Sequence, residues 1–390
     1  MRPTMSDVAA AASVSKSTVS RALSGDSRVK YETRVRIMRI AQELGYTPSF
    51  SATALARGRT WMIGVATPGT PRGFSDPFYL EFLGGLGDGA IRAGYNLLIA
   101  APSPDEEAPG GSALMEAAAA AATETGARAA ADKEASAAGF AGRSRGMDLR
   151  GIIAQGAVDA VALTEPAEND PRLAVLRQYG VPFAFLGTCE ENGREAEGVS
   201  FVDGDNVGGA RTAVAHLIAL GHRRIACVTG AAGLVSTRHR LEGYRQAMAA
   251  AGLPVDERWI VDGESTKAGG RRAMENLLAM GLGRDAEAPT AVFAANDVMA
   301  IGALLAAREA GLRVPDDVSI VGFDGIPMAE VVDPPLTTVQ QPIYELGRKL
   351  ADVILTLLEA ERRKEAPVLQ EIVPCRLVVR GSTAPLRARA

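Results

Sequence analysis

Cysteine and histidine are scarce in this chain of 390 residues, which has only three of each. The cysteines are odd in number and far apart, a pattern that argues against a disulfide framework and fits a reducing cytosol. The histidines lack the spacing of metal ligands, and no serine lies in a nucleophile elbow ahead of a helix. We therefore expect no metal, no cofactor and no enzymatic activity. The residues concerned are Cys189, Cys227, Cys375, His216, His222 and His239.

Long apolar runs are also missing. No segment has the uninterrupted apolar length of a membrane span, and the N-terminus lacks the apolar core of a signal peptide. Hydrophobic residues make up 47% of the chain and charged residues 23%, an ordinary balance for a soluble protein of two or three domains. We expect the protein to stay in the cytoplasm and to have no membrane partner.

Positive charge, by contrast, is concentrated at one end of the chain. Residues 1–60 hold ten Lys and Arg against four Asp and Glu, although the whole chain carries a net charge of −4. Phosphate neutralisation with counterion release supplies most nonspecific affinity for DNA. We therefore expect a polyanionic partner for this end, and a small helical bundle for protein contacts is the alternative.

The pattern of residues 5–24 predicts two short helices joined by a tight turn. Apolar residues lie on one face of each helix, at Val8, Ala9, Ala12, Val19, Ala22 and Leu23. Ser15 can cap the second helix through its hydroxyl. The first turns of that helix then expose a polar face that suits a major groove, made of Lys16, Ser17, Ser20 and Arg21. A third helix over 32–44 is expected to close the small core with Val35, Ile37, Met38, Ile40, Ala41 and Leu44.

These residues carry a resemblance to a known family. The run TMSDVAAAASVSKSTVSRALSGDSRV, followed by ETRVRIMRIAQELGYTPSFSATALARGRT, resembles the DNA-binding headpiece of the lactose-repressor/galactose-repressor (LacI/GalR) family of bacterial transcription regulators. The resemblance implies a helix-turn-helix headpiece over 1–47, a hinge over 48–60 and a core over 61–390. One departure is Ser13, which stands where the family usually has glycine and where a left-handed backbone would cost serine more.

The resemblance also assigns DNA contacts. Bases would be read by the recognition helix through Lys16, Ser17 and Arg21. The phosphate backbone would be held by Thr4, Ser15, Thr18, Ser20 and Arg28. In the hinge, Leu55 matches the residue that enters the minor groove, where unstacking bases costs a few kcal/mol per step. Packing of linker against core is the alternative for Leu55.

From Trp61 onward, short β-rich runs alternate with helical ones, which predicts parallel sheets flanked by helices. We expect an N-terminal lobe over about 61–187, a C-terminal lobe over about 188–324 with its first strand near Val199, and crossovers over about 325–380 that include a helix from Tyr344. By the resemblance, this is the two-lobed α/β fold of periplasmic sugar-binding proteins. The alanine-rich stretch 102–148 is longer than the usual family connection, and its role stays open. The run GGLGDGA at 84–90 lacks nucleotide-loop spacing and predicts either a tolerated glycine-rich helix or a closely packed interface instead.

Ligands of open α/β sheets bind beyond the carboxyl ends of strands. Asn296 and Asp324 follow the runs AVFAA and SIVGF, and we expect Asp297 to cap the helix that it precedes. The resemblance assigns effector contacts to Phe78, Tyr79, Ser236, Arg240, Asn296, Asp324 and Gln341. Core packing remains the alternative for Phe78, and a surface or interlobe ion pair for Arg240. Gly187 stands where some family members have an acidic ligand contact.

Together these observations predict a homodimeric, nucleoid-associated repressor that binds a near-palindromic operator and responds to a small polar effector, a sugar or sugar derivative. The alternatives are a corepressor-dependent or activating regulator with a nucleobase-like effector, a ligand-independent architectural DNA binder, and an enzyme using Asp297 and Asp324.

Overall fold

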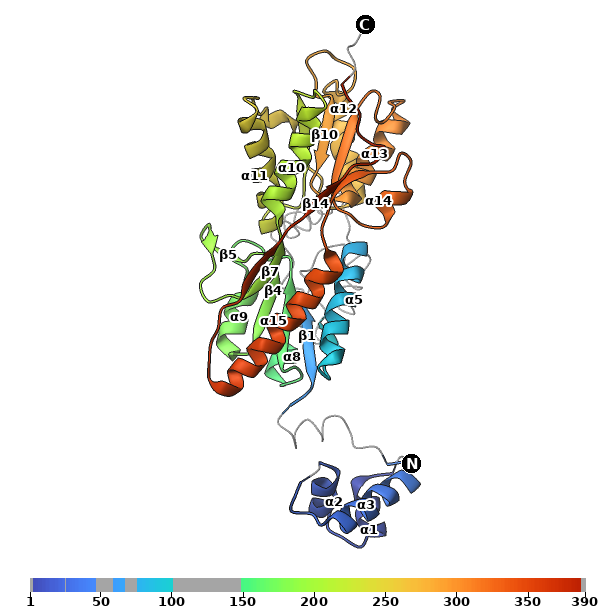
Figure 1. Ribbon diagram of the computed structural model, residues 1–390, viewed down its shortest axis with the longest axis vertical. Coiled ribbons are helices and arrows are strands. Elements are labelled where there is room, and N and C mark those ends of the chain that lie inside the picture. The colour runs from blue at the N-terminus through green and yellow to red at the C-terminus, as the bar shows by residue number, and fades with distance from the viewer. Residues whose placement is uncertain (1–2, 25, 47–58, 67–75, 101–148, 387–390) are drawn as a thin grey trace, which may run out of the picture.

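The computed structural model describes residues 3–24, 26–46, 59–66, 76–100 and 149–386. It consists of a helical headpiece and two α/β lobes (Figure 1). Leu55, most of the predicted hinge and the whole alanine-rich stretch 102–148 lie outside the described residues. Among the helices that are described, none is long and apolar enough to cross a membrane.

The headpiece is a three-helix bundle. Its helices are α1 (Met5–Ala11), α2 (Lys16–Leu23) and α3 (Tyr31–Glu43). The apolar faces of α1 and α2 are buried as predicted, except that Leu23 is only partly buried. Of the α3 residues expected in the core, Ile37 and Ala41 are buried, whereas Val35, Met38 and Leu44 are 40–54% exposed. The prediction was wrong for these three because a bundle this small covers only one narrow face of α3.

The N-terminal lobe contains a six-stranded parallel sheet covered on both faces. Alternate residues of β3 enter two cores, because Ala160 and Ala162 face α5 and α15 while Val161 and Leu163 face α8 and α9. The strands, in spatial order, are β13 (Gln370–Val373), β7 (Phe201–Gly204), β4 (Phe183–Leu186), β3 (Ala160–Thr164), β1 (Met62–Ala66) and β2 (Asn96–Ala100). The helices are α5 (Pro77–Arg92), α8 (Leu149–Ala154), α9 (Arg172–Tyr179) and α15 (Ile343–Arg363), and a small hairpin is formed by β5 (Glu190–Glu191) and β6 (Arg194–Glu195).

Helices α5 and α15 pack unusually closely, as the second interpretation of the glycine run at 84–90 predicted. A Cβ atom on Gly85 would lie 2.0 Å from the carbonyl oxygen of Tyr344, and one on Gly347 would lie 2.2 Å from that of Phe82. Backbone therefore touches backbone where the helices meet, and only glycine fits there.

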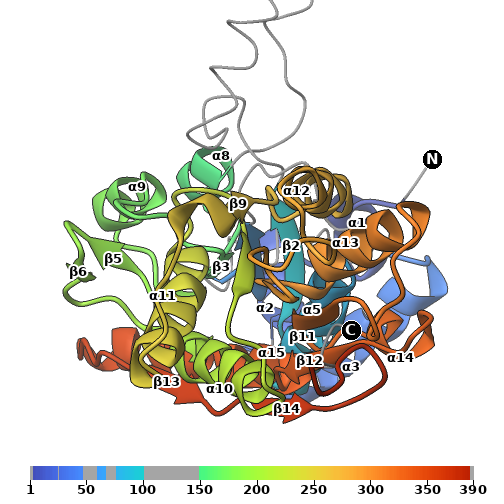
Figure 2. The ribbon, with the colours of Figure 1, turned by 90° about the horizontal axis from the view of Figure 1, so that it is seen from above.

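The C-terminal lobe repeats this architecture with a second six-stranded sheet. Helices α10 (Asn206–Ala219) and α11 (Val235–Ala250) cover one face, and α12 (Lys267–Ala279) and α13 (Asp297–Glu309) cover the other (Figure 2). The strands, in spatial order, are β14 (Arg376–Val378), β12 (Thr337–Gln340), β11 (Ser319–Asp324), β10 (Ala291–Ala294), β8 (Ile225–Thr229) and β9 (Ile260–Asp262), of which only β14 is antiparallel to its neighbour. A short helix, α14 (Met328–Val331), follows β11.

The chain passes between the lobes three times, after β7, after β12 and after β13. The predicted boundary near 188 was therefore wrong, because β7 pairs with β4 in the N-terminal sheet through Phe185 and Phe201. The predicted crossover region beginning at 325 was also too early, since β12 still belongs to the C-terminal sheet. The strands of the two lobes have similar compositions, so the sequence pattern alone does not reveal which sheet a strand next to a crossover joins.

Candidate DNA-binding and effector sites

Helix α2 presents the polar face that the sequence predicted. Ser15 caps the helix by accepting a hydrogen bond from the Thr18 amide at 3.1 Å. Lys16, Ser17 and Arg21 are exposed, and Thr18 and Ser20 are partly exposed. Val19 and Ala22 on the opposite face are buried in the headpiece core. The fold thus orients the candidate base-reading side chains toward solvent.

The hydroxyl groups at the start of α2 are connected to one another. Ser15 Oγ lies 2.7 Å from Ser17 Oγ and 2.8 Å from Thr18 Oγ1. This arrangement groups three small donors at a helix N-terminus, where backbone amides and the helix dipole favour an anion such as a phosphate.

Two other candidate phosphate contacts are already hydrogen-bonded within the headpiece. Thr4 donates from its amide and its hydroxyl to Asp7 at 2.7 and 2.8 Å, and these bonds lower the pKa of Asp7. Arg28 chelates Asp26 through Nε and Nη2, which holds the pKa of Asp26 at about 2. Because the Arg28 side chain is 74% exposed, a phosphate can compete with Asp26 for it in solvent.

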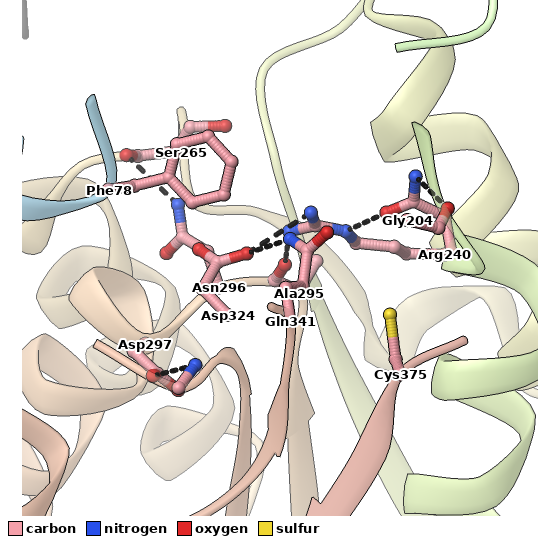
Figure 3. Close-up of polar contacts among 12 residues, drawn as sticks. Phe78, Gly204, Arg240, Ser265, Ala295, Asn296, Asp297, Asp324, Gln341 and Cys375 are labelled. Carbon is pink, nitrogen blue, oxygen red and sulfur yellow. Dashed lines mark hydrogen bonds and ion pairs between the residues drawn. The ribbon is translucent and has the colours of Figure 1, made fainter. Parts of the chain in front are cut away.

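All seven candidate effector residues line a single cavity between the lobes. The cavity contains about 710 Å³ of space, its solvent-open mouth included. Helix α5 provides Phe78 and Tyr79, and α11 provides Ser236 and Arg240. The remaining three follow the carboxyl ends of neighbouring strands, and Figure 3 shows several of these side chains converging: Asn296 after β10, Asp324 at the end of β11 and Gln341 after β12.

Arg240 is the centre of the polar network in this cavity. Its Nε donates to Asn206 Oδ1 at 2.8 Å, and its Nη1 donates to the carbonyl of Ala295. Its Nη2 lies 3.1 Å from Asp324 Oδ1, and the guanidinium lies over the Phe323 ring at 4.0 Å. The side chain is only 12% exposed. The guanidinium is therefore fixed in orientation before any ligand arrives.

Asp324 connects the strand end to the second crossover. Its Oδ1 also accepts from Gln341 Nε2 at 2.9 Å, and its carbonyl accepts from the Gln341 amide at 3.0 Å. Asp324 has a backbone φ of 115°, a region that L-residues seldom adopt. Strain of this kind persists where the surroundings impose it, which is common at functional sites.

Asn296, not Asp297, caps the helix that follows β10, and Asn296 also lines the cavity. Asn296 caps α13, because its Oδ1 accepts from the Met299 amide at 2.7 Å. Asp297 is fully buried and accepts from the amides of Gly325 and Ile326 and from the hydroxyl of Thr338. Burial and the nearby Asp324 raise its pKa to about 8. The predicted cap was wrong by one residue because Asn296 already has the extended backbone of an N-cap.

The Phe78 side chain lines the cavity and is also partly packed against the core. Its ring lies edge-on to Tyr79, with centroids 5.7 Å apart. Gly187 lines the cavity with φ of 108°, and a Cβ there would lie 2.8 Å from Pro166. Pro166 thus occupies the space that an acidic side chain would need.

Sequence reasoning missed Asp203, Asn206 and Ser265, which also line the cavity. Asp203 is the last residue but one of β7, near the carboxyl end of the strand, so the rule on strand ends applied to it as well. It accepts from Thr188 and from Asn206 Nδ2 at 2.9 Å, and burial raises its pKa. Ser265 has no comparable signal, because it precedes a helix cap in an irregular loop.

Comparison with known proteins identifies both parts of the chain. Residues 4–49 match the model of bacterial regulatory proteins of the lacI family, and residues 214–383 match a periplasmic binding protein-like domain. The HTH-type transcriptional regulator DegA of Bacillus subtilis (strain 168) is 33% identical over 99% of both chains.

Solved structures agree over the whole length. A complex of the transcriptional regulator CelR with cellobiose has a TM-score of 0.66 and 32% identity, covering 98% of this chain and 100% of that one. The Lac repressor dimer bound to operator and the anti-inducer ONPF has a TM-score of 0.74 and 27% identity at the same coverage. The chain therefore belongs to the LacI family of bacterial transcriptional regulators and is a DNA-binding regulator, not an enzyme.

Proposed function

We propose that the protein is a homodimeric repressor of nucleoid DNA whose affinity for a near-palindromic operator changes when a small polar effector binds between its lobes. The effector is a sugar or a sugar derivative. The relative CelR was solved with cellobiose, which supports this class of ligand.

The interlobe cavity is the observation that carries the proposal. It combines an apolar ring at Phe78 with fixed hydrogen-bonding groups, the pairing that a sugar ring with its hydroxyls requires. The guanidinium of Arg240 and the carboxylate of Asp324 hold each other in place, so ligand hydroxyls meet donors and acceptors of set direction. We assign effector contact to these residues together with Tyr79, Ser236, Asn296 and Gln341.

The same network explains how a ligand would act on DNA binding. Asn206 follows the first crossover and Gln341 precedes α15, so two of the three crossovers are hydrogen-bonded to the cavity. A ligand that fits one lobe angle better than another shifts the equilibrium between them by its difference in affinity. On the DNA side we assign base contacts to Lys16, Ser17 and Arg21, and phosphate contacts to Thr4, Ser15, Thr18, Ser20 and Arg28. Leu55 is proposed to enter the minor groove at the operator centre.

A selection experiment tests this function. Full-length protein is used to select bound fragments from a random DNA library, and the selection is repeated with pooled sugars and with pooled nucleobases. We expect a near-palindromic consensus whose recovery changes with a sugar pool. A response to the nucleobase pool alone would contradict the sugar assignment, and binding without a consensus would contradict the function.

Two carboxylate variants locate the effector site. Asp324→Asn should keep the DNA consensus and lose the response to the sugar pool, and asparagine tolerates the positive φ at this position. The control is Asp352→Asn, on an exposed face of α15. The control should behave as the wild type in both selections.

A further inference from the structure

The lobes also touch beside the cavity, where the loop after β3 meets the start of α11. The amide of Glu168 donates to the carbonyl of Gly233 at 3.0 Å, and the amide of Val235 donates to the carbonyl of Pro166 at 3.2 Å. Pro166 and Leu234 also line the cavity. These backbone contacts therefore close part of the cavity wall.

Next to this edge, two groups of the C-terminal lobe hold one carboxylate of the N-terminal lobe. Glu190 Oε1 lies 2.9 Å from His239 Nε2, and Glu190 Oε2 pairs with the guanidinium of Arg238. The Glu190 side chain is only 8% exposed. The β5–β6 hairpin that bears Glu190 and the helix α11 that bears its partners lie on the same side of the molecule in both ribbon views (Figures 1 and 2).

The hairpin is fastened to its own lobe. The carbonyl of Glu190 accepts from the amide of Asn169 at 2.9 Å, and the neighbouring Glu191 accepts two hydrogen bonds from Arg177 at 2.8 and 2.9 Å. Cys189 is buried in the core beside α9. Glu190 therefore moves with the N-terminal lobe, and separating the lobes must pull it away from Arg238 and His239.

We propose that Glu190, Arg238 and His239 form a clasp that holds the lobes closed and sets how often the cavity opens to exchange its ligand. The three crossovers join the lobes covalently, whereas the clasp is noncovalent and can break and reform. Glu190 and His239 are largely buried, although Arg238 is 49% exposed, so salt screens this cluster less than a pair on the open surface and the attraction favours closure. When the lobes open, water hydrates the Glu190 carboxylate. This hydration offsets part of the lost attraction to Arg238 and His239, so the clasp stays reversible.

Hydrogen exchange of the full chain tests the clasp without a ligand. The amides of Glu168 and Val235 donate across the lobes, so they exchange when the lobes separate. Glu190→Gln should accelerate exchange at both amides about tenfold, equivalent to ~1.4 kcal/mol. Arg238→Ala should act in the same direction, and the two variants combined should fall short of the product of their effects.

The matched control is Glu191→Gln, which breaks the pair with Arg177 inside the N-terminal lobe. It should leave exchange at Glu168 and Val235 unchanged, and amides of the central strands β3 and β8 should be unaffected in every variant. Equal rates in wild type and Glu190→Gln, equal acceleration in Glu191→Gln, or acceleration that extends to β3 and β8 would each overturn the clasp.

Discussion

Replacing Ser13 with glycine should stabilise the headpiece. Ser13 has φ of 52° in the turn between α1 and α2. A left-handed conformation costs an L-residue ~1–2 kcal/mol. Glycine removes that cost, but it also makes the unfolded chain more flexible, which reduces the gain in folding stability by ~0.4–1 kcal/mol. The net gain is therefore ~0.5–1 kcal/mol, and exchange of the α1 and α2 amides in the full chain should slow about two- to fivefold.

Ser24→Gly is the matched control for this prediction. Ser24 ends α2 with φ of −83°, so glycine there relieves no strain and only adds flexibility to the unfolded state. Exchange of the same amides should become faster in this variant. If Ser13→Gly also accelerated exchange, the energetic argument about the turn would be refuted.

Three further predictions concern DNA reading, helix packing and pH. Arg21→Ala should reduce operator preference by ~1–3 kcal/mol in binding titrations with unchanged effector affinity, and an unchanged consensus would contradict the placement of the recognition helix. Gly85→Ala should lower the melting temperature more than Gly87→Ala, because a Cβ on Gly85 would lie 2.0 Å from Tyr344 backbone whereas one on Gly87 meets only a side chain at 3.7 Å. Because the pKa of Asp297 is raised from 3.8 to about 8, its protonated form favours folding, and stability is lost as pH rises from 4 to 8. Urea unfolding across this range should show that slope in the wild type and a smaller one in Asp297→Asn.

Local rules recovered much of the molecule from sequence. Apolar spacing and the Ser15 cap placed α1 and α2, because neighbouring residues alone determine a helix start and its buried face. Strand ends located Asn296 and Asp324 near one site, since parallel strands end at the same edge of a sheet. Phe78 and Arg240 came from family resemblance, because helices distant in the sequence meet only in the folded chain.

What local rules missed depends on pairing between distant segments. Strand β7 belongs to the N-terminal sheet because it pairs with β4, and the residues of β7 alone do not predict that pairing. The clasp at Glu190 joins groups about fifty residues apart in sequence and from different lobes. Exposure of Val35 and Met38 reflects how little surface a small bundle can cover.

Helix α15 connects the effector cavity with the region where the chain leaves for the headpiece. It begins two residues after Gln341 in the cavity, and its far end lies near Arg59, where Leu358, Glu361 and Arg59 line a common hollow. Twenty-one residues span about 30 Å, so a tilt of only about 4° at the cavity displaces the far end by roughly 2 Å. Backbone contact with α5 at Gly85 and Gly347 supports the first turns of the helix, next to the cavity. A small rotation of α15 at the cavity would thus become a larger displacement near Arg59, where the chain leads toward the headpiece.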